Sequence, residues 1–221
     1  MLKPAILALL TLLPARAFAQ EYRYLQTIGK DRSFQTVTIR PDASGAALSV
    51  VLKDSGFAET HTFTLASDLS TLRWVYEYPD GRSAVFTRKG NGIRSEGYLP
   101  GKHPESEAEI DEAPWYAVIG MGLGRFVRDG EMKASFWTVN PDNGKAYKMA
   151  ARRRGGETIV RDGRPVPAIK VTVSVSGVPA AFYATEYWFR ESDGVLLRFE
   201  GTSRGPGSPK TILELAEEFS R

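Results

Sequence analysis

The chain has 221 residues, no cysteine, two histidines and a formal net charge of +3. Without cysteine the protein forms no disulfide and carries no cysteine-linked lipid anchor, and two histidines are too few for a typical zinc site. Removing the cations Lys3 and Arg16 with the N-terminal segment leaves a charge of +1, which gives no reason to expect a nucleic-acid partner.

The first twenty residues, MLKPAILALLTLLPARAFAQ, have the pattern of a secretory signal peptide. Lys3 gives a positive start, Ala5–Leu13 is an apolar run, and Ala17–Ala19 fits the small-x-small rule for cleavage. The alternative is a membrane anchor, but a span needs about 20 apolar residues and this run is less than half as long. We therefore predict cleavage near Ala19, a periplasmic or secreted location, and a single β-rich domain over residues 20–221 that does not span a membrane.

Apolar and polar residues alternate through most of the mature chain, which is typical of half-buried β-strands. In the clearest case, Ile169–Ser176, the odd positions are apolar and face one side, and the even positions are polar and face the other. Near the end of the chain, TILELAEEF fits a last strand, with a short helix as the alternative. Similar patterns predict strands at Phe34–Arg40, Leu48–Lys53, Leu72–Tyr78, Met132–Phe136, Phe182–Arg190 and Val195–Phe199.

Three turn sequences join pairs of these runs: YPDGR at Tyr78–Arg82, NPDNGK at Asn140–Lys145 and ESDGV at Glu191–Val195. Asp-Gly and Asn-Gly tolerate the positive φ of tight hairpin turns, so each turn predicts a hairpin between sequence neighbours. We therefore predict a mainly β fold, with an antiparallel, strongly curved sheet or open β-barrel of about 10–11 strands.

The longest region without strand character is Gly101–Pro114, GKHPESEAEIDEAP, which we predict to be an exposed acidic loop. Its carboxylates lack the spacing and the turn glycine of a calcium-binding loop. His61 and His103 stand in no recognisable ligand pattern. We therefore predict no metal site and no cofactor.

An apolar, glycine-rich stretch, WYAVIGMGLGRFV, follows at Trp115–Val127. It is too short to span a membrane, and its evenly spaced glycines lack the βαβ context of a dinucleotide-binding loop. Pro114 suits a first helical turn, Arg128 a last turn and Asp129–Gly130 a stop, so a helix is favoured over a buried strand. We predict a Gly-rich helix over about 114–128, enclosed by the sheet, whose glycines each cost about 1 kcal/mol unless they permit close packing.

The order of elements after residue 70 resembles that of known exported proteins. The apolar helix is followed by a hairpin over Glu131–Ile159, the strand VPAIKVTVSV and the run EYWFRESDGVLLRFEG. This last run contains an aromatic motif formed by Tyr187, Trp188, Phe189, Gly194, Leu196 and Arg198.

Over roughly residues 70–203 the pattern resembles a family of exported bacterial proteins of unknown function and the lipoprotein-carrier proteins of the periplasm, which fold as open β-barrels closed by helices. The resemblance implies an open barrel around a helix and an apolar or lipid ligand, and it implies no catalytic residue. The chain departs from it in lacking a lipid-anchor cysteine, and its strands before residue 70 have no counterpart.

Catalytic chemistry has two weak candidates. Glu186 and Glu200 lie on adjacent predicted strands, and paired carboxylates can hydrolyse glycosides, but strand glutamates usually pair with surface cations such as Arg190 or Arg198. A Ser–His–acid triad needs a histidine beside a nucleophile, and neither histidine has that context. We predict that the protein is not an enzyme.

Aromatic residues and one basic run supply the candidate binding residues. An aromatic stripe either lines a cavity or fills a core. The run Arg152, Arg153 and Arg154 either binds an anionic lipid group or protects a sheet edge by its charge. The candidate ligand-binding residues on the concave face are Trp74, Tyr76, Trp115, Phe136 and Trp188.

These observations predict an exported, monomeric, non-enzymatic protein of the bacterial envelope that binds an apolar or lipid-like ligand, or an envelope partner, in the concave face of the sheet. The alternative is an envelope scaffold or protein-interaction module with a filled core and no small ligand. A cavity on the order of several hundred Å³ beside the helix favours the first hypothesis, and a filled interior favours the second.

Overall fold

The computed structural model describes residues 19–41, 48–56, 58–98, 105–141, 143–177, 184–202 and 209–220. Nearly all of the predicted signal peptide, together with His103 and Phe182, lies outside these residues. No helix in the described ranges is long and apolar enough to cross a membrane.

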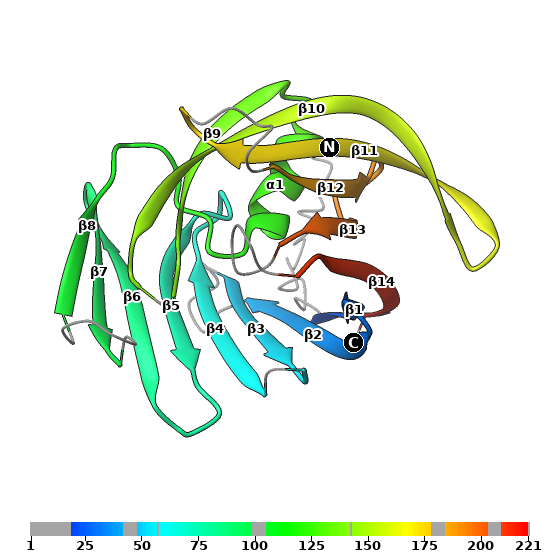
Figure 1. Cartoon of the computed structure of the whole chain (residues 1–221). Helices are drawn as coiled ribbons and strands as arrows, with labels where there is room; N and C mark the ends of the chain where they lie inside the picture. Colours follow the sequence, from blue (N-terminus) through cyan, green and yellow to red (C-terminus); the bar gives the residue numbers. More distant parts are fainter. Residues whose placement is uncertain are drawn as a thin grey trace, which may run out of the picture.

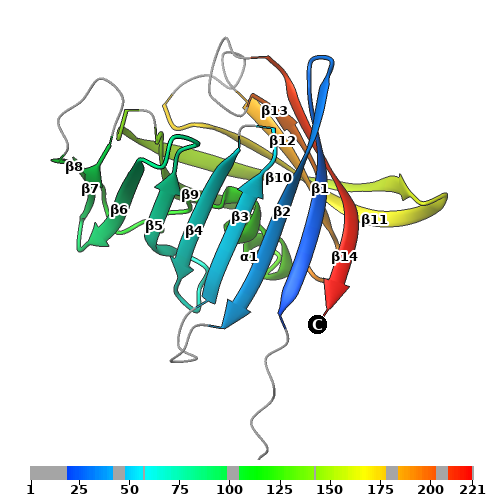
Figure 2. The same ribbon diagram turned by 90° about the horizontal axis from the view of Figure 1, so that it is seen from below.

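Among the residues that the structure describes, one curved antiparallel sheet of 14 strands forms most of the fold, and a single helix, α1 (Ile119–Arg128), lies inside its curve (Figures 1 and 2). The first seven strands are β1 (Gln20–Ile28), β2 (Asp31–Pro41), β3 (Leu48–Asp54), β4 (Glu59–Leu65), β5 (Thr71–Glu77), β6 (Ser83–Lys89) and β7 (Gly92–Gly97). The others are β8 (Glu105–Glu109), β9 (Lys133–Val139), β10 (Ala146–Arg161), β11 (Arg164–Val175), β12 (Ala184–Arg190), β13 (Leu196–Gly201) and β14 (Thr211–Ser220).

The sheet order is β8-β7-β6-β5-β4-β3-β2-β1-β14-β13-β12-β11-β10-β9. The first and last strands, β1 and β14, pair with each other in the middle of the sheet. β8 and β9 are the two edges, and α1 lies between them in the sequence. The sheet is therefore an open barrel, as the alternation pattern predicted.

The three predicted hairpins are confirmed, since Tyr78–Arg82, Asn140–Lys145 and Glu191–Val195 connect β5 to β6, β9 to β10 and β12 to β13. The predicted strand count was too low. β8 lies inside the segment that we expected to be an acidic loop, where glutamates replace the apolar alternation. Charged side chains suit β8 because an edge strand with an unpaired side must discourage pairing with other chains.

The helix ends where predicted but begins five residues later. Gly130 follows with φ +73°, and Glu131 N–H donates back to the Phe126 carbonyl at 3.3 Å, so the helix ends after Arg128. At the other end, Trp137 N–H donates to the Pro114 carbonyl at 2.8 Å, and Tyr116 N–H donates to the Trp137 carbonyl at 2.8 Å. Backbone groups that a first helical turn would need are therefore engaged in a short parallel bridge to β9.

All three glycines of α1 lie at close contacts. A Cβ on Gly120 would stand 3.0 Å from Leu196 Cδ2, and one on Gly124 would stand 2.5 Å from the Gly194 carbonyl oxygen. A Cβ on Gly122 would overlap the ring of Tyr116. The glycines therefore let the helix backbone approach the β12–β13 turn, which offsets their low helix propensity.

The helix covers only half of the concave face. Leu123, Phe126 and Val127 of α1 share one buried cluster with residues of β9 to β13, including Phe136 and Phe189. A second cluster follows the inner face of β1 to β7. Because α1 packs on the β9–β13 half, the inner wall of β1 to β5 has no helix of its own against it, and this leaves room for a cavity.

Candidate ligand-binding cavity

A cavity of about 1230 Å³ lies between α1 and the inner wall of β1 to β5. Apolar side chains from both sides line it, among them Val37, Leu52 and Phe63 on the sheet and Val118 and Met121 near the start of the helix. Residues of β10 to β14, such as Met149, Val173 and Leu213, complete the wall. In Figure 2 the helix lies behind β2 to β4, within the curve that encloses this space.

The strand register arranges the inner wall of β1 to β5 in rows that run across the strands. We call the row nearest the β1–β2 and β3–β4 turns the polar row, formed by Tyr24, Gln35, Asp54 and Glu59. The next row is mixed and consists of Tyr22, Val37, Leu52, His61 and Tyr76. The third is apolar except at β1 and consists of Gln20, Ile39, Val50, Phe63 and Trp74.

Hydrogen bonds connect the polar row to Gln26, which follows Tyr24 on the same face of β1. Gln35 Nε2 donates to Asp54 Oδ2 at 2.7 Å and also to Gln26 Oε1. The other Asp54 oxygen, Oδ1, accepts from Gly56 N–H at 2.8 Å. Gln26 is 1% exposed and Asp54 is 5% exposed, so these polar groups are buried within the cavity wall.

His61 lies at the centre of an aromatic group in the next two rows. Its ring stacks on Tyr76 with centroids 4.6 Å apart, and its Nδ1 accepts from Trp74 Nε1–H at 3.2 Å. The other ring nitrogen, Nε2, lies 3.8 Å from Glu59 Oε2. The imidazole therefore faces an indole and a carboxylate, and neither is the hydroxyl or thiol group that a histidine base activates.

Burial raises the pKa of the Tyr24 phenol well above its ordinary value, and the nearby Tyr22 and Glu218 raise it further. The pKa of Tyr22 is raised in the same direction, also mainly by burial. Both tyrosines line the cavity and keep their hydroxyl protons at neutral pH. The wall therefore offers hydroxyl, amide and carboxylate groups at the polar row and apolar surface elsewhere.

The predicted aromatic binding residues separate into two groups. Trp74 and Tyr76 line the cavity. Trp115 and Phe136 are fully buried in the core and are absent from the cavity wall. Trp188 is also absent from the wall, because it lies among charged neighbours where Nε1–H donates to Glu157 at 2.7 Å and Lys170 stacks over the ring at 4.8 Å.

The three predicted arginines lie near a bulge of β10 and do not line the cavity. Arg153 donates to the Val127 carbonyl at 3.3 Å, and Arg154 donates to Thr172 Oγ1 at 3.0 Å. Arg152 is exposed. The run therefore does not form a single anion site within the cavity.

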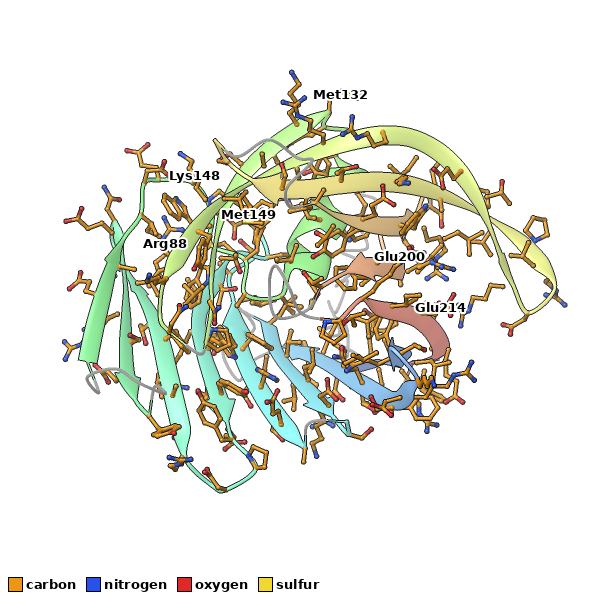
Figure 3. The ribbon with its side chains drawn as sticks, in the orientation of Figure 1. Arg88, Met132, Lys148, Met149, Glu200 and Glu214 are labelled. Carbon is orange, nitrogen blue, oxygen red and sulfur yellow. The ribbon has the colours of Figure 1, made fainter. Side chains whose placement is uncertain are left out.

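The alternative carboxylate pair forms part of a surface charge network. Glu186 and Glu200 face each other across β12 and β13, as the hairpin predicted. Glu186 pairs with Lys170 at 2.9 Å, and Glu200 pairs with Lys210 at 2.6 Å and with Arg198. Figure 3 labels Glu200 beside Glu214, which pairs with the same Arg198 at 2.9 Å. Within the described residues, no group of three or more His, Asp or Glu side chains is arranged to hold a metal.

Sequence reasoning missed the polar row. Its signal is a polar residue at an inward position of an otherwise apolar alternation, as in β3, where Leu48, Val50 and Leu52 share a face with Asp54. A polar residue at that position is equally consistent with the strand ending there. Only the register shows that Gln35, Asp54 and Glu59 come together.

No protein-family model matches the chain, and no curated protein matches it in sequence. Among solved structures, a β-barrel-like protein of the domain of unknown function DUF1849 from Brucella abortus superposes with a TM-score of 0.57 at 8% identity, over 93% of this chain and 99% of that one. The class that the fold defines is therefore an open, β-barrel-like protein, and the likeness includes strands before residue 70 that had no counterpart in the sequence comparison.

Two further solved structures resemble the chain at lower TM-scores. The hypothetical lipoprotein YmcC from Escherichia coli gives a TM-score of 0.38 at 11% identity, over 93% of this chain and 89% of that one. A LolA superfamily protein from Nitrosomonas europaea gives 0.28 at 10% identity, over 95% and 88%. These scores are too low to support any conclusion about this chain.

Proposed function

We propose that the protein binds an apolar or lipid-like ligand in the cavity between α1 and β1 to β5, without catalysis. The supporting observation is the cavity itself, which has a volume of about 1230 Å³ and is lined mainly by aliphatic and aromatic side chains. Small-molecule sites typically enclose roughly 300–1,000 Å³, so this space is large enough for a long ligand. The alternative of a scaffold requires a filled core.

The energetics are sufficient for useful affinity. Each buried methylene contributes about 0.8 kcal/mol, so about twenty of them contribute about 16 kcal/mol before the cost of association. Association costs several kcal/mol, and a micromolar complex needs a net gain of about 8 kcal/mol. A ligand with one or two alkyl chains therefore fits both the volume and the affinity expected of a carrier.

The proposal includes export and action as a monomer in the bacterial envelope. The signal-peptide pattern before Gln20 supports export. N-terminal sequencing of the protein from the envelope fraction should begin at or near Gln20. A full-length N-terminus on cytosolic protein would contradict this part of the proposal.

Displacement of an uncharged apolar dye, N-phenyl-1-naphthylamine, tests ligand binding. We expect saturable dye fluorescence with one site per chain and displacement by single-chain lipids. Leu52→Trp places a large side chain in the cavity and should weaken dye binding at least about tenfold. Val51→Trp is the matched control, because the neighbouring position on β3 faces the other side and should leave binding unchanged. Equal effects of the two variants, or no saturable binding, would contradict the proposed function.

A further inference from the structure

The outer face of β9 to β11 carries cations that the cavity does not use. Ala151 and Val171 face inward and belong to the buried cluster around α1. Successive side chains of a strand face opposite sides, so the neighbouring Arg152 and Thr172 face outward. Lys133 lies directly opposite Arg152 in the register and shares this outer face.

A third cation joins these two. Arg154 lies at the bulge of β10, and its Nε donates to Thr172 Oγ1 at 3.0 Å, so its guanidinium also lies on the outer face. We call Lys133, Arg152 and Arg154 the cationic row. None of the three forms an ion pair with a residue that the structure describes.

The carboxylates around the cationic row leave it with a net positive charge. Glu186 of β12 continues the row across the sheet, but it pairs with Lys170 at 2.9 Å. Asp129, at the end of α1, pairs with Arg125 at 3.2 Å. Glu131 is exposed and stands alone against the three cations. Like charges directly opposite each other on a sheet repel, so the arrangement favours an anionic partner.

Protection of a sheet edge explains only one of these cations. β9 is an edge strand, and Lys133 on it discourages pairing with other chains. β10 lies between β9 and β11, so Arg152 and Arg154 protect no edge. The whole chain has a formal net charge of only +3, so the cationic row is a local concentration of charge on this face.

An exposed apolar side chain stands at the end of the row. Met132 precedes Lys133 and is 63% exposed, and Figure 3 labels it at the outer margin of the molecule. Its carbonyl accepts from Arg153 N–H at 3.0 Å, which holds it beside β10. Met132 also follows closely after the last turn of α1, where Arg125 and Arg128 line the cavity. Positive charge and an apolar side chain therefore meet where the helix ends.

We propose that Met132 and the cationic row together dock the protein on a lipid bilayer that contains anionic phospholipids. A guanidinium group binds phosphate by two parallel hydrogen bonds, and each cation close to an anionic bilayer strengthens binding about fivefold. Met132 enters the headgroup region, where an apolar side chain is more favourable than in water. A soluble polyanion would pair with the cations but leave Met132 in water, so a bilayer accounts for both features. Docking requires no ligand in the cavity and is separate from the proposed function.

Sedimentation of the full mature chain with lipid vesicles tests the proposal. We expect binding to vesicles of phosphatidylcholine mixed with phosphatidylglycerol, and at least about tenfold weaker binding to phosphatidylcholine alone. Lys133→Gln combined with Arg152→Gln should weaken binding to the mixed vesicles at least about tenfold, because two cations of the row are removed. Lys30→Gln combined with Arg32→Gln is the matched control. It removes the same charge from exposed positions at the β1–β2 turn and should change binding less than about twofold.

The apolar part of the surface has its own pair of variants. Met132→Ser should weaken binding to the mixed vesicles about threefold or more, because the side chain no longer gains from leaving water. Val160→Ser changes a residue that is 72% exposed at the tip of the β10–β11 hairpin and should leave binding unchanged.

Equal binding of wild-type protein to the two kinds of vesicle would overturn the proposal, and this comparison needs no variant to fold. Equal losses in the two charge variants would overturn it as well. Binding to soluble polyglutamate without binding to vesicles would overturn it in favour of an acidic protein partner. Lys133→Gln combined with Arg152→Gln should leave N-phenyl-1-naphthylamine binding unchanged, so a failure of docking is distinguishable from a failure of the proposed function.

Discussion

At the scale of single residues, the glycines of α1 decide how closely the helix approaches the sheet. A side chain at Gly124 would meet the backbone carbonyl of Gly194, which sits in the β12–β13 turn with φ +71°. Backbone cannot move aside as a side chain can. At Gly120 the nearest atom is the end of the flexible Leu196 side chain.

We therefore expect Gly124→Ala and Gly120→Ala to differ although both occupy the same helix. Alanine gains about 1 kcal/mol of helix propensity at either position. At Gly124 the overlap with Gly194 costs more than this gain, so the variant should lose about 1–2 kcal/mol of unfolding free energy. For Gly120→Ala, the unfolding free energy should differ from that of wild type by less than about 1 kcal/mol. Urea denaturation measures both values, and equal values would show that the helix does not approach the turn as described.

The sequence supports this contact only in part. Three glycines in an otherwise helical pattern predict close packing, because nothing else offsets their cost. Their partners were not predictable, since Leu196 and Gly194 lie about seventy residues away and only the folded sheet brings them to α1. The same reason explains why Gln26, Gln35 and Asp54 were missed: each is an ordinary polar residue until the register places them together.

At the scale of elements, the β10–β11 hairpin is longer than its neighbours, and its tip reaches β14 (Figure 1). Arg161 at the tip donates to Glu218 Oε1 at 2.7 Å and to the Ala216 carbonyl at 3.2 Å. Arg190 of β12 holds both oxygens of the same Glu218, at 2.8 and 3.0 Å. Glu218 thus joins three elements at one end of the barrel.

Acid should weaken this junction. Burial alone would raise the pKa of Glu218, but hydrogen bonds from Arg190 and Arg161 outweigh it and lower the pKa below its ordinary value of 4.5. A carboxyl whose pKa is lowered by folding contributes stability above its unfolded pKa and loses that contribution as the pH falls through the folded value. At neutral pH, the unfolding free energy of Glu218→Gln should be about 1–2 kcal/mol lower than that of wild type. When the pH falls from about 5 to about 3, the unfolding free energy of the variant should decrease by less than that of wild type.

The matched control for this prediction is Glu217→Gln. Its side chain lies next to Glu218 on β14 and pairs with Arg23 at 3.4 Å in an exposed position. Exposed pairs contribute about 0–1 kcal/mol, so this variant should resemble wild type in urea denaturation at both pH values. If the two variants lost equal stability, Glu218 would not hold the hairpin tip.

Alternation and turn chemistry predicted most elements of the sheet, because strands with one apolar face show their period directly in the sequence. These two signals did not predict the strands whose inward face is not apolar. β1 places Gln20 and Gln26 toward the cavity, and β8 carries glutamates at an edge. The strands that depart from the pattern thus lie at the cavity and at the open edge.

At the scale of the whole molecule, the chain before α1 joins β5 and β6 in one half of the sheet to the edge strand β9 and its neighbour β10. Thr71 N–H of β5 donates to the Trp115 carbonyl at 2.7 Å, and Arg88 of β6 donates to the Ala113 carbonyl at 3.1 Å. On the other side, Trp137 Nε1–H of β9 donates to Asp111 Oδ1 at 2.7 Å. Lys148 of β10 pairs with the same carboxylate, and Figure 3 labels Arg88 and Lys148 on this side of the molecule.

Charge and hydrogen bonds hold Asp111 in this position. The hydrogen bond from Lys148, which is the larger cause, and the one from Trp137 lower the pKa of the Asp111 carboxyl to about 2. The sequence placed Asp111 in an exposed acidic loop, where the structure also has it, but it placed Trp115 in a helix, and that position was wrong. A segment whose backbone bonds to distant strands shows neither helical nor strand periodicity in its sequence. Local sequence patterns therefore predict for it the secondary structure of the adjacent element.

Trp115 is the buried centre of this connection, and truncating it should loosen the whole barrel. It is 0% exposed, so Trp115→Ala should lose about 3–5 kcal/mol of unfolding free energy, the usual cost of removing a large buried aromatic side chain. Its Nε1–H has no hydrogen-bond partner among the described residues, so Trp115→Phe, which keeps a ring and removes that donor, should lose less than about 2 kcal/mol. Hydrogen exchange in Trp115→Ala should quicken at Thr71 and Trp137 together, because their amide groups bond to the segment from opposite halves of the sheet. Faster exchange at only one of these two amides, or equal stability of the two variants, would show that the segment does not connect the two halves.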